Sequence, residues 1–446
     1  MLYYAKATNS FTSNALSKKR VTPFSYASTL LHSLGFINQP VYRDERHAQA
    51  LWAQSGAMWL SGHQKESPRF CPAPIAACAQ GVWLALSSLY PKHFDARFSA
   101  HQLLGERAAI AGLQRQGKTS AGGACRLYKT CDGALALNLV RDDDRELLPA
   151  WLEQSVSSDA ELVAVLKERE VSSIVKRARM MGLAAAPVMA PKPCGRWFRP
   201  TRYVAPVAPT HQAPLVIDLS SLWAGPLCAQ LLSQFGARVI KVESTRRPDG
   251  ARSGPADFYQ LMNAGKESVA LDLKSEQGQN QLRQLLAKAD IVIEASRPRA
   301  LKQMGIKASD YLLARPGTSW LSITGYGREQ PMADWIAYGD DAGVAAGLSS
   351  LMGGVQGEPV FCGDAIADPL VGLHAALLAL ASWRQGGGLL LDISLHNVVS
   401  YCIGSGFSSA SEKNYSVRRP VSRKPLESAA VMGVDTLRIL QEFGVS

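Results

Sequence analysis

The stretch Leu215-Val-Ile-Asp-Leu-Ser-Ser-Leu-Trp-Ala-Gly-Pro-Leu-Cys-Ala-Gln-Leu-Leu-Ser-Gln-Phe-Gly-Ala-Arg-Val-Ile-Lys-Val-Glu243 decides the fold. Its first five residues are a short apolar run, which is typical of a buried strand. Pro226 fits the first turn of a helix, the following leucines recur at helical spacing, and Gly236 ends that helix. Residues 238–242 form the next strand. A strand, a crossover helix and a second strand predict the start of a doubly wound, Rossmann-like parallel sheet.

The rest of the chain extends this α/β prediction and adds a smaller α+β domain. Strands are predicted at 269–273, 290–294, 319–324 and 389–395, and helices at 275–289, 300–304, 308–314, 369–383 and 436–443. The expected domains are a helical N-terminal region (1–118), a small α+β domain (119–190), a Pro-rich linker (191–213) and the large domain (214–446). Within the small domain, Asp132-Gly133 predicts a tight hairpin whose central residues favour positive φ.

Composition limits the functional classes. The chain has 446 residues, of which 47% are hydrophobic and 19% charged, so it is globular. It contains no apolar stretch of the ~18 residues that a membrane span needs, and its start lacks a signal-peptide pattern, so we expect a cytoplasmic protein. The net charge of +11 is spread along the chain, which favours an anionic small molecule over nucleic acid. The eight cysteines form no CxxC pair, so we expect free buried thiols and no metal site.

Eight motifs, in order and at consistent spacing, resemble CoA-transferase family III, the CaiB/BaiF family. They are Val216-Ile-Asp-Leu-Ser220, Ala224-Gly-Pro-Leu227, Phe235-Gly-Ala-Arg-Val-Ile-Lys-Val-Glu243, Ser268-Val-Ala-Leu-Asp-Leu-Lys274, Ala289-Asp-Ile-Val-Ile-Glu294, Gly325-Tyr-Gly327, Ala367-Asp-Pro-Leu-Val-Gly-Leu-His-Ala-Ala376 and the terminal helix at 432–444. The resemblance implies transfer of coenzyme A from an acyl-CoA to a carboxylic acid. It implies CoA thioesters as substrates, no permanently bound cofactor, and a homodimer.

The order of the domains departs from this family. In the family the small domain follows the strand that matches 389–395, whereas here a similar segment precedes the large domain. The chain therefore resembles either a fusion of two eroded copies or a permuted one. Under the first interpretation, residues 1–118 are a degenerate copy of part of the large domain.

The resemblance assigns Asp368 as the nucleophile. From the residues alone, Asp368 precedes Pro369 at the start of an apolar helix, where the helix dipole favours a carboxylate. The implied reaction passes through an aspartyl mixed anhydride and an aspartyl-CoA thioester. Tyr338 matches a family tyrosine near the active site. Gly122 and Gly123 are the candidates for the family's glycine loop over the aspartate.

CoA is expected across the carboxyl ends of the parallel strands, as for ligands of open α/β sheets. Arginine forks match phosphate geometry, and the resemblance adds positions that line the nucleotide pocket. The CoA-binding candidates are Trp223, Ala224, Gly225, Arg246, Arg247, Arg252, Leu271, Lys274, Arg297 and Arg299.

Three alternatives bear on the function. The family's racemases use a histidine in a Gly-His-Asp motif, but residues 337–341 read Ala-Tyr-Gly-Asp-Asp, so transfer is favoured over racemisation. A nicotinamide dehydrogenase would carry GxGxxG after the first strand, and residues 220–236 do not. A CoA-binding protein without turnover stays open. His374 is expected to be a packed helix residue, and Asp340-Asp341 an exposed loop.

Overall fold

A computed structural model describes residues 20–37, 39–93, 95, 97–192, 194–354, 357–406, 415–425 and 427–445. Its centre is a seven-stranded sheet in the order β4-β10-β9-β8-β5-β6-β7, parallel throughout except at β4. The strands are β4 (Phe198–Arg202), β5 (Leu215–Asp218), β6 (Arg238–Ser244), β7 (Glu267–Leu271), β8 (Ile291–Glu294), β9 (Ser319–Thr324) and β10 (Leu389–Ser394). This order confirms the predicted doubly wound sheet, and its direction of winding reverses between β5 and β8.

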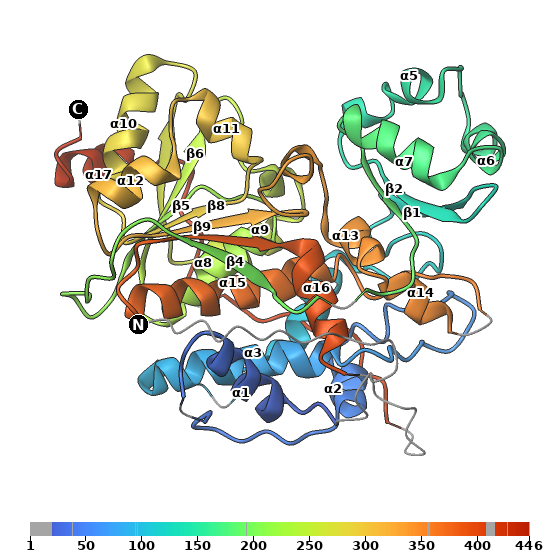
Figure 1. Cartoon of the computed structure of the whole chain (residues 1–446), viewed down its shortest axis with the longest axis horizontal. Helices are drawn as coiled ribbons and strands as arrows, with labels where there is room; N and C mark the ends of the chain where they lie inside the picture. Colours follow the sequence, from blue (N-terminus) through green and yellow to red (C-terminus); the bar gives the residue numbers. More distant parts are fainter. Residues whose placement is uncertain are drawn as a thin grey trace.

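Helices cover both faces of the sheet because its strands are apolar on both sides. Figure 1 shows one group of helices above the sheet and α8 (Ala224–Gln234) with α15 (Ala367–Arg384) below it. The upper group is α10 (Glu276–Leu286), α11 (Pro298–Gln303) and α12 (Ala308–Ala314), and α17 (Thr436–Glu442) packs beside β7. Two separate clusters of buried side chains fill the two faces.

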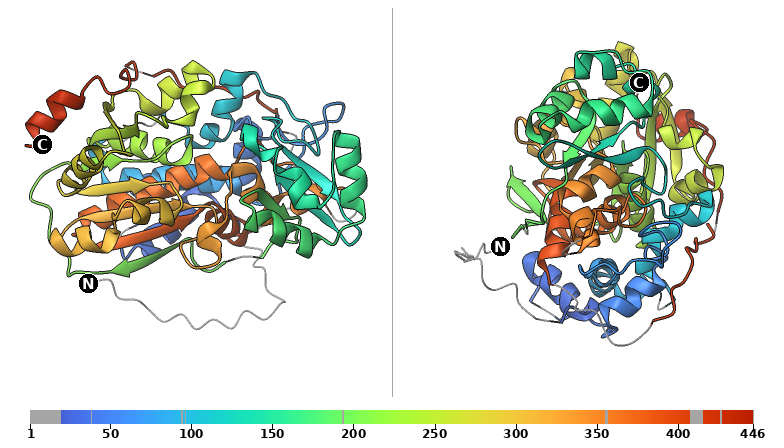
Figure 2. Two further views of the ribbon diagram at one scale, coloured as in Figure 1. Left: turned by 90° about the horizontal axis from the view of Figure 1, so that it is seen from above. Right: turned by 90° about the vertical axis from the view of Figure 1, so that its right-hand side faces the viewer.

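The N-terminal helices form a third tier, under α15. They are α1 (Pro23–Ser33), α2 (Ala48–Gln54), α3 (Ile75–Leu89) and α4 (Glu106–Ala111). Figures 1 and 2 show α1 and α3, in blue, alongside α15, and α3 shares its buried core. Within the region that was expected to be helical, α4 is preceded by a 3-10 turn at Ala100–Gly105. Gly112 ends α4 in the left-handed conformation.

The small domain lies to one side of the sheet (Figure 1). It pairs β1 (Cys125–Lys129), β2 (Ala134–Asn138) and β3 (Ala184–Pro187) as an antiparallel sheet, covered by α5 (Leu148–Leu152), α6 (Asp159–Lys167) and α7 (Val171–Met180). The predicted hairpin exists, but its turn geometry was wrong. Lys129 pairs with Ala134, which leaves a four-residue loop, and neither Asp132 nor Gly133 has a positive φ. Asp132 instead accepts a hydrogen bond from the Val171 amide at 2.8 Å.

Several elements lay beyond the local sequence pattern. Strand β4 falls inside the Pro-rich stretch that was expected to be a linker. The local pattern did not predict this strand because its partner, β10, is almost 200 residues away. The helices α9 (Ala256–Asn263), α13 (Gly339–Ala345), α14 (Leu348–Gly353) and α16 (Leu395–Gly404) were not predicted. Among the described residues, no helix has both the length and the hydrophobicity of a membrane span.

Candidate active site

Asp368 lies in the first turn of α15, as predicted. Its amide donates to the carbonyl oxygen of Ala365 at 2.9 Å, and its half-buried carboxylate faces the start of α13. Ala365 has a φ of 39°, a conformation that side chains other than glycine rarely adopt. Such strain persists only where the surrounding structure holds it, and it is concentrated at functional sites.

Gly339, the first residue of α13, makes room for this carboxylate. A Cβ at Gly339 would lie 2.7 Å from the carbonyl carbon of Ala365 and closer still to Oδ2 of Asp368. No side chain fits there without moving the aspartate or the strained turn. The sequence motif around Tyr338 contained this glycine, but its local pattern gave no sign of the contact.

The pair Asp340-Asp341 belongs to the site, so the prediction of an exposed loop was wrong. Both residues lie in the first turn of α13, and Asp341 is completely buried. Asp341 accepts hydrogen bonds of 2.9 Å from the side-chain amide of Asn138 and from the Tyr338 backbone. Asp340 accepts one of 2.9 Å from the Ala365 amide. A local pattern of polar residues could not reveal that the small domain covers them.

This crowding of carboxylates changes their protonation. Burial raises the pKa of Asp368 to about 7, Asp340 and Asp341 add to the rise, and Arg107 opposes it. Burial and Asp364 raise the pKa of Asp340 to about 7. Burial likewise raises the pKa of Asp341 to about 6. Near neutral pH the site therefore holds fewer negative charges than its carboxylates suggest.

Arg107 brings a positive charge to these carboxylates from the N-terminal helices. Its Nε donates to Asp364 at 2.9 Å and its Nη2 donates to the other oxygen of the same carboxylate. Its guanidinium lies over the ring of Trp223, 5.2 Å from the centroid. Sequence analysis missed both Arg107 and Asp364, because they are 257 positions apart.

The predicted glycine loop reaches this neighbourhood through Gly122. A Cβ at Gly122 would lie 3.1 Å from Nη2 of Arg107 and 3.8 Å from Asp364, whereas one at Gly123 would meet nothing within 4 Å. Tyr338 precedes the contact at Gly339 and is half-buried. Burial raises the pKa of its hydroxyl, and Arg141 opposes that rise. The catalytic roles of Gly122, Gly123 and Tyr338 stay predictions.

Buried ion pairs fix the loop between β5 and α8. Asp218 accepts from the Ser220 amide and pairs with Lys266 at 2.9 Å, and Lys266 also donates to the Pro226 carbonyl. Lys241 joins the Ser220 carbonyl to Asp249 with two 2.9 Å bonds. These contacts account for the Asp-Leu-Ser motif, because they hold the entry to α8 in place.

The CoA-binding candidates on this loop are packed against protein. Trp223 is 3% exposed and meets Phe258 edge to face, and Ala224 is also buried. Gly225 lies so close to the side chain of Ser220 that a Cβ would not fit. Their contact with CoA stays a prediction.

The candidates near β6 and β7 are spread over a wider surface. Arg246 is exposed and pairs with Asp272, while Arg252 pairs with Glu243 and stacks on Tyr259. The remaining three are Arg247 and Lys274, which are exposed, and Leu271, which is buried in the sheet core.

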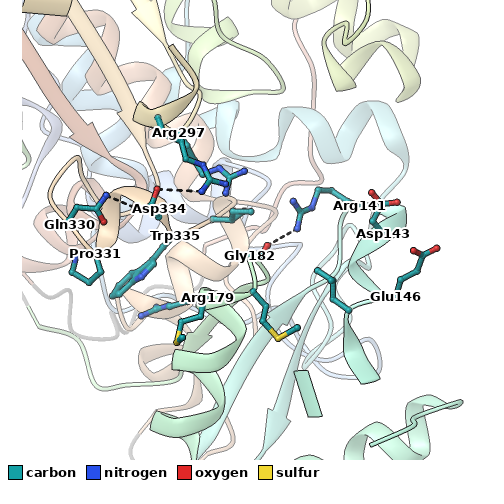
Figure 3. Close-up of a pocket in the computed structure, with 15 residues that line it drawn as sticks. Arg141, Asp143, Glu146, Arg179, Gly182, Arg297, Gln330, Pro331, Asp334 and Trp335 are labelled. Carbon is teal, nitrogen blue, oxygen red and sulfur yellow. Dashed lines mark hydrogen bonds and ion pairs between the residues drawn. The ribbon is translucent and has the colours of Figure 1, made fainter. Parts of the chain in front are cut away.

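A cavity of about 730 Å³ opens where the small domain faces the loops after β8 and β9. Figure 3 shows arginines on both sides of it: Arg297 on one, Arg141 and Arg179 on the other. Arg299 also lines the cavity. Arg179 stacks on Trp335 at 3.9 Å and Arg299 lies 4.0 Å from Asp334. Within the described part of the chain, the guanidinium of Arg297 has no hydrogen bond or ion pair, and burial together with Arg299 and Arg141 lowers its pKa. The four arginines of the cavity are accompanied by three carboxylates, those of Asp143, Glu146 and Asp334.

This cavity is close to Asp368. Ile336 lines it, and Gly339, three residues further on, lies against the Asp368 carboxylate. Three residues span at most about 11 Å of chain. The cavity and the Asp368 carboxylate are therefore near neighbours.

His374 is a packed helix residue, as predicted. Its Nε2 lies 2.8 Å from the Tyr26 hydroxyl and its Nδ1 lies 2.7 Å from the Leu370 carbonyl. All eight cysteines are free, but Cys131 is exposed and Cys194 half-buried, so the expectation of buried thiols was wrong for these two.

Comparison with known proteins identifies the large domain. Residues 214–434 match CoA-transferase family III. The chain is 32% identical over 213 residues to the succinate–glutarate CoA-transferase of Agrobacterium fabrum, covering 43% of this chain and 53% of the relative. It is 33% identical over 199 residues to the succinyl-CoA:glutarate CoA-transferase of Mus musculus, covering 42% and 46%.

The chain thus spans about half the length of the curated relatives it matches. Among solved structures, a CaiB/BaiF family protein from Brucella suis is 30% identical, covering 43% of this chain and 55% of that one with a TM-score of 0.37. Residues 214–434 of this chain are thus similar to CoA-transferase family III.

Proposed function

We propose that this protein transfers coenzyme A from an acyl-CoA thioester to a carboxylic acid, with Asp368 as the nucleophile. The observation that carries the proposal is the carboxylate itself. It lies in a helix's first turn, beside a strained backbone turn, a glycine without room for a side chain and an arginine. The named relatives are CoA-transferases, which supports the same reaction class.

The first half of the reaction loads CoA onto the enzyme. An Asp368 oxygen attacks the thioester carbonyl, the carbon–sulfur bond breaks, and CoA leaves as a thiolate. The thiolate then attacks the aspartyl carbonyl of this mixed anhydride and releases the donor acid as its carboxylate. Asp368 is left as a CoA thioester.

The second half reverses these steps with a different acid. The acceptor carboxylate attacks the aspartyl thioester, and the CoA thiolate leaves again. The thiolate then attacks the acceptor's carbonyl in the new anhydride, which forms the product thioester and frees the Asp368 carboxylate. No proton is gained or lost overall. Each tetrahedral step develops an oxyanion, and the backbone amides at the start of α13 are nearby donors.

The arginine-lined cavity is the proposed site for the CoA phosphates. Arginine forks bind phosphate bidentately, and Arg297 has no protein partner to displace. An Arg297→Ala variant is expected to raise the Kd for CoA, measured by calorimetry. Arg246→Ala, which removes an exposed arginine paired with Asp272, tests whether the predicted site extends to that loop.

Trapping the aspartyl thioester tests the mechanism. The protein is incubated with acyl-CoA thioesters, treated with hydroxylamine and digested. Mass spectrometry should find a hydroxamate at Asp368 in the wild-type protein and none in Asp368→Ala. A protein that binds CoA but forms no hydroxamate with any thioester would favour the racemase or the non-enzymatic interpretation instead.

The cellular setting of this reaction also belongs to the proposal. A homodimer and a cytoplasmic location are the predicted assembly and compartment. Light scattering of the purified protein and fractionation of cells measure them independently of activity.

A further inference from the structure

Two pairs of packed helices in this chain repeat one another. Gly81 of α3 lies against the first turn of α1, where a Cβ would be 2.7 Å from the carbonyl oxygen of Pro23. Gly372 of α15 lies against the first turn of α8, where a Cβ would be 2.9 Å from the carbonyl oxygen of Ala224. Pro23 and Ala224 are each the first residue of their helix. The same close contact is therefore made twice, at the same helical position.

The sequences of the two pairs match in the same alignment. Leu30-Leu-His-Ser-Leu-Gly35 of α1 corresponds to Leu231-Leu-Ser-Gln-Phe-Gly236 of α8, and both glycines have positive φ, 82° and 91°. Aligning Gly81 with Gly372 also pairs Ile75-Ala-Ala77 with Ile366-Ala-Asp368. Ala77 thus stands in the first copy where the second copy carries the nucleophile.

The first copy has lost the other parts of a site as well. Across residues 20–111, apart from the gaps at 38, 94 and 96, the structure contains helices and no strand. What remains packs on the second copy, because α3 lies along α15 and shares its core. A copy that cannot react can still contribute to its neighbour's site.

Arg107 is that contribution. It lies in α4, within the eroded copy, and pairs with the fully buried Asp364 through Nε and Nη2. Its Nη1 has no hydrogen-bond partner among the residues that the structure describes, and the side chain is 30% exposed. A guanidinium that is held on one edge by Asp364, is open on the other and acts electrostatically on Asp368 has the chemistry that binds a carboxylate.

We propose that Arg107, supplied by the eroded N-terminal copy, binds the carboxylate of the acceptor acid as it attacks the loaded Asp368. This inference rests on the proposed function. The acceptor is an anion that has to approach a cluster of four carboxylates, so it needs a fixed cation at the point of attack. The donor thioester carries no charge at its reacting carbonyl, and its own phosphates belong to the cavity near Arg297. Arg107 therefore serves the second half of the reaction more than the first.

The two halves can be measured separately. Loading of Asp368 is followed by hydroxylamine trapping with acyl-CoA alone, and the full reaction by product formation at varied acceptor concentration. Loading is compared well above pH 7, where Asp368 is ionised with or without Arg107, and in Arg107→Met it is expected to stay within about threefold of wild type. The KM for the acceptor is expected to rise about 10- to 100-fold, the effect of losing one charge-assisted hydrogen bond. Arg107→Lys keeps the charge without the fork and should fall between the two.

Controls separate binding from folding. Arg115 lies in the same segment, 5.2 Å from the centroid of the Trp59 ring, but donates only to backbone carbonyls. Arg115→Met should leave the KM for the acceptor unchanged. Because Arg107→Met leaves Asp364 buried without its partner, the double variant with Asp364→Asn keeps the test valid if the single variant does not fold.

The outcomes are distinct. An unchanged KM for the acceptor, or a loading rate that falls as far as the full reaction, would overturn the role of Arg107. Absence of any hydroxamate in the wild-type protein would instead overturn the proposed function on which it rests.

Discussion

Replacement of Gly339 by alanine tests the geometry of the nucleophile most directly. The new Cβ would lie 2.7 Å from the Ala365 carbonyl carbon and closer still to Oδ2 of Asp368, whereas ordinary contact begins at 3.4 Å. The turn at Ala365 or the carboxylate must therefore move by at least about 0.7 Å. Misplacement of a reacting group by ~1 Å can cost on the order of 10²-fold in rate. We expect loading of Asp368 by acyl-CoA to slow about 10- to 100-fold.

The same variant should be less stable. Forcing an extra carbon into a packed site costs about 1–3 kcal/mol of unfolding free energy, which urea denaturation measures. Gly343→Ala is the matched control, because it lies in the same helix and its Cβ would meet its nearest neighbour at 3.6 Å. It should load normally and be equally or more stable, since alanine favours helix by up to about 1 kcal/mol. Normal loading and stability in Gly339→Ala would refute the proposed contact.

Two further variants test the electrostatics of the site. The loading rate should fall below about pH 7, because Asp368 must be ionised to attack. Asp340→Asn removes a charge that helps raise the pKa of Asp368, so this fall in rate should move to lower pH. The pKa of the Asp340 carboxyl is itself raised from 3.8 to about 7. The wild-type folded state therefore loses stability as the pH rises from 3.8 to about 7, because the carboxyl ionises more readily in the unfolded chain. Urea denaturation should find the Asp340→Asn variant more stable than wild type at about pH 8 and equally stable near about pH 4. Lys266→Met leaves Asp218 buried without its ion pair and should cost about 3–5 kcal/mol in urea denaturation, of which the double variant with Asp218→Asn recovers a part.

Local periodicity in the sequence predicted the main framework of the large domain. Residues 308–314 form the predicted helix α12 and residues 319–324 the predicted strand β9, with the same bounds. Asp368 was placed at the start of an apolar helix for the same reason, because the signals for a helix start lie within a few residues of it. What depends on neighbours along the chain could be deduced from the chain.

Long-range packing decided the rest. Arg107 meets Asp364 across 257 positions, and Asn138 meets Asp341 across 203, so no local pattern could associate them. The pair Asp340-Asp341 was misjudged for the same reason: two adjacent carboxylates favour solvent unless distant segments cover and hydrogen-bond them. The sequence by itself determined most strands and helices of the main sheet, and its resemblance to a family indicated the candidate nucleophile. Only the tertiary structure decided which charges surround that nucleophile, because burial and pairing depend on segments that meet only when the chain folds.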